Sequence, residues 1–560
     1  MLIKKAEAPL RTLFVGFQDQ DNLGLRYLMA TAGAAGHHTD IETFSDDPAV
    51  LIRKVMADKP DFIGFSLIFQ FMTAKFAAVI DALRQAGVTA HIALGGHYPS
   101  FDPKEVLSVV NGADSVIRFE GEATLLDLLA HLGRGTAWQE TEGLVARLDD
   151  GAIRENRLRK QIMRLDDIPW PDRGDIPYER SERPTAAILG SRGCPWNCDF
   201  CSIRPFYEAQ DGALRRLRSP GDVVAEMRHL YHDRGVALFL FQDDDFLATG
   251  ARARNWAGDV ADLIADSDIG GKVAWKMSCR SDELRPDIIR RMKHGGLTHV
   301  YMGVESGDAQ GLKNMNKMMG PEKHIAAGKM LRAEGLSFDF GFMLLDPWSD
   351  MRMVRANVDF LDTFVGDGWS VAGFCRMLPY SGTPVARKLK AEGRLGGTAF
   401  EPDYRFLDPV LDRFYAWMLE TFHTRNFTGR GLANLLRGMI FESRLQSTHT
   451  SWMTPEETRW LQFITARANR SATMTLRQAL DYFERTPLQD VTVHSGFLAA
   501  LTRRELTEQG LITDQLDRFW GDAERQARRR AVHDRTPAGG FGKSWTFADN
   551  DWETRGIGVR

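Results

Sequence analysis

Three of the five cysteines in this 560-residue chain lie within eight positions, at Cys194, Cys198 and Cys201. Glycines Gly190 and Gly193 precede them, and glycine lets a tight loop turn several thiolates toward one object without steric conflict from the backbone. Three thiolates on a four-iron cube leave one iron without a protein ligand, so that iron could bind a substrate or a second cofactor. The CxxxCxxC spacing therefore favours an open iron–sulfur cluster.

A structural zinc site and a disulfide framework are the alternatives for these cysteines. A closed zinc site needs four ligands, usually as two close pairs, and no second pair follows because Cys279 and Cys375 are isolated from each other. Five cysteines in so long a chain, without a recognisable signal peptide, do not predict a disulfide framework. We expect Cys279 and Cys375 to be ordinary buried thiols.

The run CPWNCDFC, residues 194–201, resembles the cluster motif of the radical S-adenosylmethionine (radical SAM) enzymes. The resemblance implies a [4Fe–4S] cluster on the three cysteines and S-adenosylmethionine (SAM) on the free iron. It also implies SAM contacts from the segments QDDDF (242–246), MSCRSDE (277–283) and GVESG (303–307), through these residues: Asp243, Asp244, Ser278, Arg280 and Glu305. An arginine fork at Arg280 suits a carboxylate. The alternative for the three adjacent carboxylates is a solvated loop or a helix cap.

Short apolar runs alternate with helical patterns from residue 1 to about 150. We expect strands over these runs: 13–17, 40–44, 62–66, 91–94 and 116–119, with helices between them such as 25–35 and 74–85. Five βα units predict a parallel, doubly wound, Rossmann-like sheet whose ligand lies at the carboxyl ends of the strands. No GxGxxG follows the first strand, which argues against a dinucleotide.

The strand ends of this segment carry glycine and polar residues, among them GGHYPS (95–100) and EGEAT (120–124). These two stretches resemble the cobalamin-binding domain that precedes the cluster domain in one radical SAM class. The resemblance implies cobalamin contacts from the following residues: Asp21, Ser66, Gly95, Gly96, His97, Glu120 and Gly121. In the motif DxHxxG, Asp21 replaces the histidine that ligates cobalt, so this loop would give cobalt no histidine ligand. An ordinary surface-loop histidine is the alternative for His97.

A proline- and charge-rich linker is expected over 151–180, before the alternation of strands and helices resumes. The strand candidates are 186–189, 237–241, 273–277, 299–303, 338–344 and 370–374, with helices at 220–232, capped by Ser219, and 321–334. Six parallel strands predict a partial (β/α)6 TIM-type barrel over 181–385, with its reactive face at the strand ends. Residues 386–535 read as a helical domain that covers the barrel mouth and shapes the substrate pocket, and residues 536–560 as a loosely held tail.

Composition and charge are those of an ordinary globular protein. Hydrophobic residues make up 43% and charged residues 26%, and at 63.0 kDa about three domains are expected. The net charge of -4 and the pI near 6.4 give no electrostatic case for nucleic acid. We expect no membrane span, because there is no apolar run of about 18 residues, and a reducing cytoplasm suits the free thiols.

These motifs, in this order, resemble the cobalamin-dependent radical SAM enzymes over residues 1 to about 385. The resemblance implies a methyltransferase in which a 5′-deoxyadenosyl radical takes hydrogen from an unactivated carbon of a small, natural-product-type substrate and methylcobalamin supplies the methyl group. A flavodoxin or ferredoxin is implied as the electron donor. The alternatives are a cyclase or rearrangement enzyme, of the tetrapyrrole ring-closure type, and a non-catalytic cobalamin-binding sensor.

Overall fold

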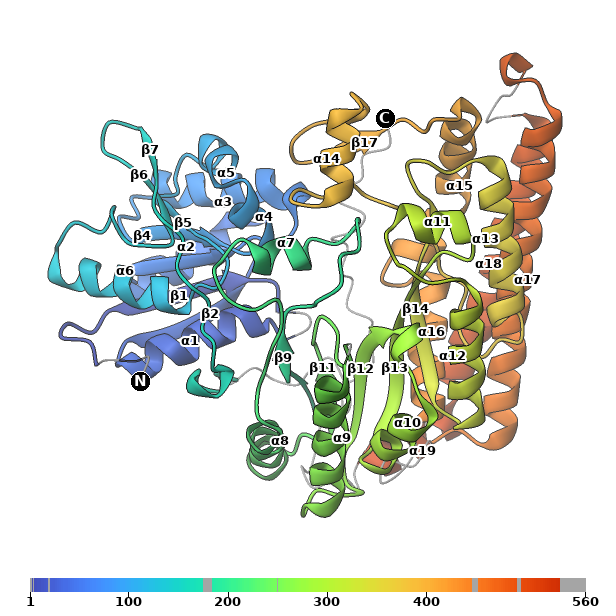
Figure 1. The fold of residues 1–560 in the computed structure, drawn as a ribbon, viewed down its shortest axis with the longest axis horizontal. Coiled ribbons are helices and arrows are strands. Elements are labelled where there is room, and N and C mark those ends of the chain that lie inside the picture. The colour runs from blue at the N-terminus through green and yellow to red at the C-terminus, as the bar shows by residue number, and fades with distance from the viewer. Residues whose placement is uncertain are drawn as a thin grey trace.

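Seven strands form the N-terminal sheet, in the order β2-β1-β3-β4-β5-β6-β7 (Figure 1). The computed structural model describes residues 3, 5–18, 21–174, 184–248, 250–445, 452–490 and 495–533. The first five strands are parallel: β1 (Arg11–Gly16), β2 (His38–Thr43), β3 (Phe62–Ser66), β4 (His91–Gly95) and β5 (Ser115–Ile117). Two antiparallel strands, β6 (Leu144–Arg147) and β7 (Ile153–Glu155), extend one edge, so the sheet continues into the segment expected as linker.

Helices cover both faces of this sheet, which makes it doubly wound as predicted. They are α1 (Leu23–Ala35), α2 (Pro48–Asp58), α3 (Thr73–Gln85), α4 (His97–Phe101), α5 (Pro103–Val109) and α6 (Glu122–Arg134). One apolar core joins the sheet to α2, α3 and α5, and a second joins its other face to α1 and α6. Local capping starts two of the helices where the site needs them: Asn22 accepts from the Leu25 N–H at α1, and Asp47 caps α2 ahead of Pro48.

A second sheet of six parallel strands forms the predicted partial barrel, in the order β15-β14-β13-β12-β11-β8. Its strands are β8 (Thr185–Ile188), β11 (Leu238–Phe241), β12 (Ala274–Arg280), β13 (Leu297–Glu305), β14 (Ser337–Leu345) and β15 (Cys375–Arg376). The helices around it are α8 (Pro220–Arg234), α9 (Ala251–Asp266), α10 (Pro286–His294), α11 (Ala309–Asn314), α12 (Glu322–Ala333) and α13 (Met351–Val365). Ser219 caps α8 as expected, by accepting from the Asp222 N–H.

The expected strand over 370–374 is wrong, because the last strand is the two-residue β15 that follows it. Side chains of the C-terminal helices take the backbone carbonyls of this segment. Arg425 Nη1 donates to the Ala372 carbonyl at 2.7 Å, and Asn426 Nδ2 donates to the Phe374 carbonyl at 3.0 Å. The apolar run is therefore buried as an extended connection against helices and not as part of the sheet.

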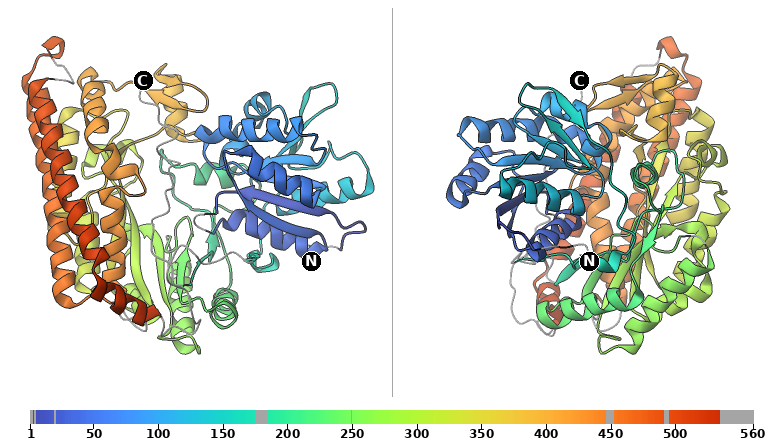
Figure 2. Two further views of the ribbon diagram at one scale, coloured as in Figure 1. Left: turned by 180° about the vertical axis from the view of Figure 1, so that it is seen from behind. Right: turned by 60° about the vertical axis from the view of Figure 1, so that its left-hand side comes forward.

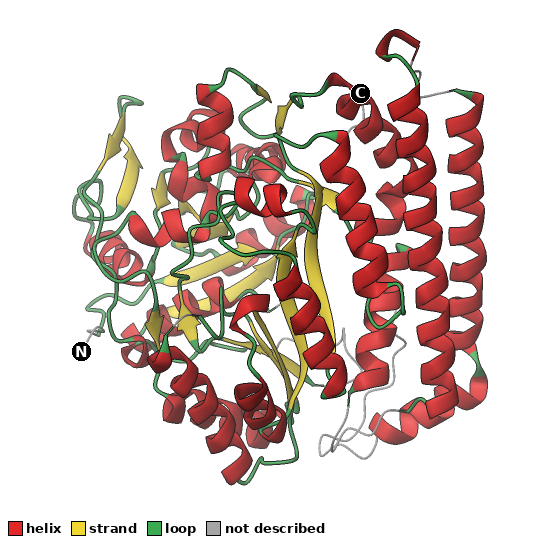
Figure 3. Ribbon diagram, turned by 45° about the vertical axis from the view of Figure 1, so that its right-hand side comes forward, coloured by secondary structure: helices red, strands yellow, loops and turns green. Residues whose placement is uncertain are grey.

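The C-terminal part of the chain is mainly helical and packs along the open side of the barrel sheet (Figures 1, 2 and 3). Its helices are α14 (Pro384–Ala391), α15 (Pro409–Phe427), α16 (Leu432–Arg444), α17 (Pro455–Arg485), α18 (Gly496–Gly521) and α19 (Ala523–His533). A capping box of Thr454 and Glu457, with Pro455 in the first turn, starts α17 where the sequence predicts a helix start. The sequence did not predict the hairpin of β16 (Leu395–Gly397) and β17 (Pro402–Tyr404).

The last two expectations concern the C-terminal tail and a membrane span. The tail expected over 536–560 lies outside the described residues. None of the helices in the described part of the chain combines the length and the hydropathy needed to cross a bilayer.

Candidate functional site

The cysteine loop leaves β8 and is closed by a short antiparallel pair, β9 (Ser191–Arg192) and β10 (Arg216–Leu217). Between them lie the three cysteines and the short helix α7 (Ile203–Glu208). Gly193 has a φ of 90°, and a Cβ built on it would lie 2.0 Å from the Leu214 carbonyl oxygen. Only glycine fits there, because the backbone is both left-handed and in contact with another backbone. This confirms the predicted use of glycine in the loop.

The three cysteines are free and partly buried. Burial raises the pKa of all three thiols, that of Cys201 to about 12. N–H groups point at the sulfurs: the Ile203 N–H lies 3.5 Å from Cys201 Sγ, and Arg280 Nη1 lies 3.8 Å from Cys198 Sγ. Hydrogen bonds to the sulfurs are one of the ways in which a protein tunes a bound cluster, so the donors fit a cluster on these thiolates.

These thiols are not arranged as a site for a single metal ion. No three His, Cys, Asp or Glu side chains among the described residues converge closely enough to hold one. In a four-iron cluster each thiolate binds a different iron, so the three sulfurs need not converge on one point. The arrangement therefore disfavours the zinc alternative and is compatible with the cluster.

The guanidinium of Arg280 packs against the cysteine loop and is bonded to other protein groups. Its guanidinium stacks on Trp196 at 3.8 Å and is paired with Asp282, with Nε 3.0 Å from Oδ1. Its Nη2 donates to the Lys317 carbonyl. These partners hold the guanidinium beside Cys198, and the contact with the SAM carboxylate stays a prediction.

The three adjacent carboxylates after β11 have three different environments. Asp243 is buried and accepts from the Gly190 N–H at 3.0 Å and from Ser191 Oγ at 2.5 Å, so it holds the start of the cysteine loop. Asp245 is also buried and accepts from the Ala248 N–H. Asp244 is exposed and accepts from the Gly193 N–H at 2.8 Å. Of the two predicted SAM contacts in this run, Asp244 is the one that a ligand can reach.

The carboxylate of Asp244 is surrounded by protein although it faces open space. Burial raises its pKa to about 6, and the neighbouring carboxylates of Asp243 and Asp245 add to this effect, while the hydrogen bond from Gly193 opposes it. A carboxylate in such a position gains most from a cationic or hydrogen-bonding ligand. An ammonium group is a ligand of that kind.

The other two predicted SAM residues lie on the inner face of the barrel sheet. Ser278 is partly buried on β12, next to Tyr301 of β13. Glu305 ends β13 with a φ of 69°, and its Oε1 lies 3.7 Å from Lys317 Nζ. Burial raises the pKa of Glu305, and the Lys317 ammonium opposes this. Both side chains are therefore placed in the interior that the cysteine loop covers.

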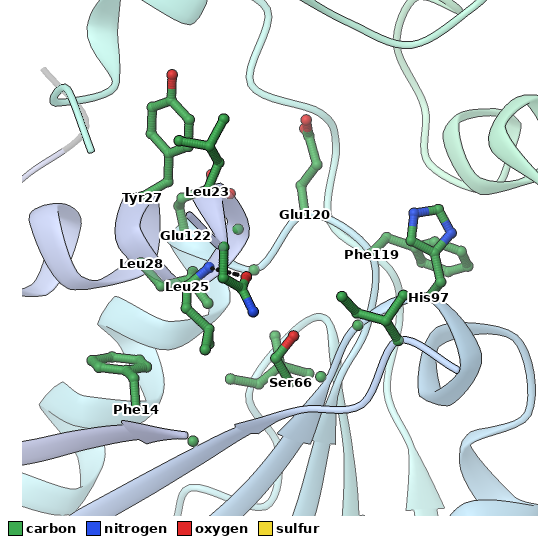
Figure 4. Close-up of a pocket in the computed structure, with 18 of the residues that line it drawn as sticks. Phe14, Leu23, Leu25, Tyr27, Leu28, Ser66, His97, Phe119, Glu120 and Glu122 are labelled. Atoms are coloured by element: carbon green, nitrogen blue, oxygen red, sulfur yellow. Dashed lines mark hydrogen bonds between the residues drawn. The ribbon is translucent and has the colours of Figure 1, made fainter. Parts of the chain in front are cut away.

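A cavity of about 520 Å³ lies where the N-terminal sheet meets the cysteine loop (Figure 4). Six of the seven predicted cobalamin residues line it: Ser66, Gly95, Gly96, His97, Glu120 and Gly121. Its wall also includes residues of the second sheet and the cysteine loop: Leu189, Ser191, Arg192, Phe206, Tyr207, Gln242 and Asp244. The cavity is thus shared by the two α/β parts of the chain.

Glycine and histidine shape the strand-end side of this cavity. Gly96 has a φ of 111°, and a Cβ on it would lie 2.6 Å from the Leu67 carbonyl oxygen, so the chain passes there as bare backbone. The His97 ring stacks on Phe206 with centroids 4.4 Å apart, and burial lowers its pKa to about 4. His97 is therefore a neutral cavity residue, and the surface-loop alternative for it is wrong.

Glu120 lines the cavity without offering it a free carboxylate. Its oxygens accept from Arg216 at 2.6 and 2.8 Å and from Arg192 at 3.2 Å. Burial alone would raise the pKa of Glu120, but the two arginines lower it. Arg192 also pairs with Glu122 at 2.7 Å, so these ion pairs join the cysteine loop to the N-terminal domain beside the cavity.

Asp21 lies outside the cavity lining, unlike the other predicted cobalamin residues. Its carboxylate pairs with Arg26 at 2.7 Å and with Arg173, and it accepts from the Ala187 N–H at 3.2 Å. These contacts connect α1 to the segment before β8 and to β8 itself. The arginine partners thus hold Asp21 in the contact between domains, and its contact with cobalamin stays a prediction.

Comparison with known proteins identifies both parts. The family model of the B12 binding domain matches residues 15–129, and that of the radical SAM superfamily matches residues 188–356. The chain is a cobalamin-dependent radical SAM protein. The predicted fold and the predicted set of cobalamin, SAM and a [4Fe–4S] cluster are those of its two domains.

Relatives of this radical SAM protein include enzymes with different activities. An uncharacterized methyltransferase of Pyrococcus horikoshii is 28% identical over 404 residues, which are 70% of this chain and 80% of the relative. The anaerobic magnesium-protoporphyrin IX monomethyl ester cyclase of Rubrivivax gelatinosus is 25% identical over 327 residues, 55% of this chain and 56% of the cyclase. The solved structure of OxsB, a cobalamin-dependent SAM radical enzyme, shares the fold, with a TM-score of 0.68 and 15% identity over 94% of this chain and 83% of OxsB.

Apart from Asp244, sequence reasoning missed the residues that the radical SAM domain contributes to the B12-binding cavity. Arg192 could have been suspected, because it stands directly before Gly193 in the motif loop. Phe206 and Tyr207 lie on α7 and reach the cavity only through the packing of the two domains. No local sequence pattern carries that information.

Proposed function

We propose that this radical SAM protein is a cobalamin-dependent methyltransferase that transfers a methyl group to an unactivated carbon of a small, natural-product-type substrate. One observation supports this most directly. Asp244 lines the cavity of the B12-binding domain and at the same time holds Gly193, the residue before Cys194. A methyl group carried in that cavity would therefore lie next to the site of radical formation.

The residues of the chain have distinct parts in this proposal. When bound, the cluster and SAM supply a 5′-deoxyadenosyl radical, and cobalamin supplies the methyl group. Cys194, Cys198 and Cys201 hold the cluster, and Asp244 accepts from the ammonium group of SAM. Gly95 and Gly96 leave the strand ends bare so that a corrinoid can approach the backbone. The electrons come from a flavodoxin or a ferredoxin.

Product analysis under anaerobic conditions tests the reaction type. The reconstituted protein, cobalamin, reductant and SAM with a trideuterated methyl group are incubated with candidate small molecules. Methyl transfer requires S-adenosylhomocysteine and 5′-deoxyadenosine to form together, with a product that is heavier by one deuterated methyl group. If a candidate substrate is consumed and 5′-deoxyadenosine forms without S-adenosylhomocysteine, methyl transfer is contradicted.

A cyclase or rearrangement enzyme is the second candidate function. It is favoured by the similarity to the magnesium-protoporphyrin cyclase, which extends over more than half of this chain. This candidate gives 5′-deoxyadenosine, no S-adenosylhomocysteine and a product without deuterium. A cobalamin-binding sensor, the third possibility raised by the sequence, would cleave no SAM at all under the same conditions.

A further inference from the structure

The inner face of the barrel sheet carries two rows of polar side chains below the level of the cysteine loop. The strand register places Lys276 beside His299 and His299 beside Ser337. In the next row toward the loop, Ser278, Tyr301 and Asp339 are neighbours in the same way. Successive side chains of a strand point to opposite faces, so both rows share one face.

That face is the inner one, because the opposite side chains pack outward. Trp275, which precedes Lys276, contacts Phe241 and Phe246 in the core under the outer helices. Below the two rows, Leu238 and Ala274 pack on Leu445, just past the end of α16. Figure 1 shows α16 running beside β14. The interior thus has an apolar floor, made in part by the C-terminal region.

Lys276 is a partly buried cation without a polar partner. Among the described residues, no hydrogen bond or ion pair reaches its Nζ, and burial lowers its pKa. The nearby Asp339 is engaged elsewhere: its Oδ2 lies 2.8 Å from Arg437 Nε of α16, and its Oδ1 accepts from the Phe340 N–H. His299 bonds to Ser337 Oγ at 2.8 Å, and burial lowers its pKa to about 4, so its ring is neutral and does not form an ion pair with Lys276.

The space above this lysine is open toward the cysteine loop. Tyr301 is 41% exposed although it lies on a central strand, and no described residue forms a hydrogen bond with its hydroxyl. The row above it consists of glycine on two neighbouring strands, Gly303 and Gly341. A Cβ on Gly341 would lie 2.8 Å from the Tyr301 hydroxyl, and one on Gly303 would lie 2.9 Å from Glu305 Oε1. The glycines therefore keep free the path from Tyr301 to Glu305.

We propose that the interior of the barrel binds the substrate through an anionic group, a carboxylate or a phosphate, held by the ammonium of Lys276 and the hydroxyl of Tyr301. Arg280, beside the predicted cluster cysteines, follows Lys276 four positions later on β12, about 13 Å along the strand. A small molecule anchored at Lys276 spans that distance with its reacting carbon toward the cysteine loop. The substrate class rests on the proposed function, whereas the anion site itself does not.

Binding of simple probes to the protein loaded with cluster and cobalamin tests this site. The probes are two pairs, each of one anion and a neutral analogue: benzoate with benzamide, and phenyl phosphate with its dimethyl ester. Affinities are measured by titration calorimetry without SAM or reductant. At least one anion should bind roughly ten times or more tightly than its neutral partner, since hydrogen bonds to charged groups are of that strength. The pair that shows the preference distinguishes carboxylate from phosphate.

Variants of two lysines on this part of the chain locate the effect. Lys276→Met should abolish the preference and Lys276→Arg should retain it, while Lys272→Met, at an exposed lysine just before β12, should change nothing. Absence of any preference in the wild type, or a preference that survives in Lys276→Met, would overturn the proposal. The binding test contains neither SAM nor reductant, so its result does not depend on whether the protein transfers methyl groups. Likewise, a failure to bind these anions would not contradict methyl transfer.

A labelling experiment on the wild type covers the case in which Lys276→Met does not fold. Acetic anhydride modifies accessible lysines, and peptide mass spectrometry reports Lys276 and Lys272 separately. The preferred anion should protect Lys276 several-fold more than its neutral partner and should leave Lys272 unprotected. Equal modification of Lys276 with both probes would contradict an anion site in the barrel.

Discussion

Asp244 accepts a hydrogen bond from the Gly193 N–H at 2.8 Å, and the same side chain lines the cavity of the B12-binding domain. Gly193, the residue before Cys194, is thereby linked directly to the wall of that cavity. Its neighbour Asp243 holds the loop from the other side, through Gly190 and Ser191. Adjacent carboxylates thus separate into one that a ligand can reach and one that supports the loop.

The two aspartates should respond differently to substitution. Asp244→Ala should retain the cluster, but its affinity for SAM should fall roughly tenfold or more, because a charge-assisted contact is lost. Asp243→Ala should lower the iron content, because it removes the carboxylate that accepts from the buried Ser191 hydroxyl and from the Gly190 N–H. Iron analysis and equilibrium SAM binding measure both. Equal loss of iron in the two variants would argue against a ligand-facing Asp244.

Gly193→Ala should prevent stable assembly of the cluster. The new Cβ would meet the Leu214 carbonyl at 2.0 Å in a left-handed backbone, so the loop must move. Gly221→Ala in α8 is the control, because a Cβ there meets nothing within 4 Å. The measurement is the visible absorbance of the reconstituted cluster, divided by the protein concentration. Full cluster content in Gly193→Ala would show that the loop does not need this geometry.

Two neighbouring glycines separate backbone strain from contact with cobalamin. A Cβ on Gly95 lies 3.5 Å from its nearest atom, an ordinary contact, whereas Gly96 has a φ of 111° and a clash at 2.6 Å. Gly95→Ala should leave the melting temperature unchanged and lower the affinity for cobalamin several-fold. Gly96→Ala should lower both the melting temperature and the affinity for cobalamin. If Gly95→Ala binds cobalamin as the wild type does, the strand end is not in contact with the corrinoid.

The sequence predicts local features of the structure better than contacts between distant residues. The strand ends, the glycine loop and the helix starts at Ser219 and Thr454 follow from neighbouring residues, and the structure confirms them. The positions of Asp21 and Arg280 depend instead on partners that a motif does not contain. Arg173 lies 152 residues from Asp21, and the stacking of Arg280 on Trp196 joins the end of β12 to the cysteine loop.

The misplaced last strand has the same physical origin. Residues 370–374 have the apolar character of a strand, but Arg425 and Asn426 bond to their carbonyls from a helix that is more than 50 residues away. The cavity lining from Phe206 and Tyr207 also depends on how two domains pack. Composition and periodicity do not predict such long-range contacts. The spacing of the three cysteines, in contrast, is local and does predict a cluster loop.

Glu457 should make the C-terminal helices sensitive to acid. Burial alone would raise its pKa, but hydrogen bonds from Arg528, the Thr454 N–H and Arg525 lower it to about 2. A carboxylate with a lowered pKa in the folded state contributes stability above its unfolded pKa and loses it as the pH falls through the folded value. This contribution should therefore decline between about pH 4.5 and pH 2.

Glu457→Gln should cost about 1 kcal/mol at neutral pH and should flatten the pH dependence, because the amide still accepts from the Thr454 N–H but loses the ion pairs with Arg525 and Arg528. Glu456→Gln is the control, because that neighbour is exposed and its ion pair with Arg459 lies on the surface. Denaturant unfolding between pH 3 and pH 7 gives both values. An identical pH profile in the wild type and Glu457→Gln would refute this account of the cap.

The cysteine triad gives the most direct test of the central claim, that the loop after β8 holds the cluster that cleaves SAM. Cys194, Cys198 and Cys201 are replaced together by alanine, and the protein is reconstituted with iron and sulfide without oxygen. Iron analysis, Mössbauer spectroscopy and release of 5′-deoxyadenosine are measured against the wild type and against Cys279→Ala. We predict no four-iron cluster and no SAM cleavage in the triple variant, with both retained in Cys279→Ala. A four-iron cluster in the triple variant would contradict the assignment.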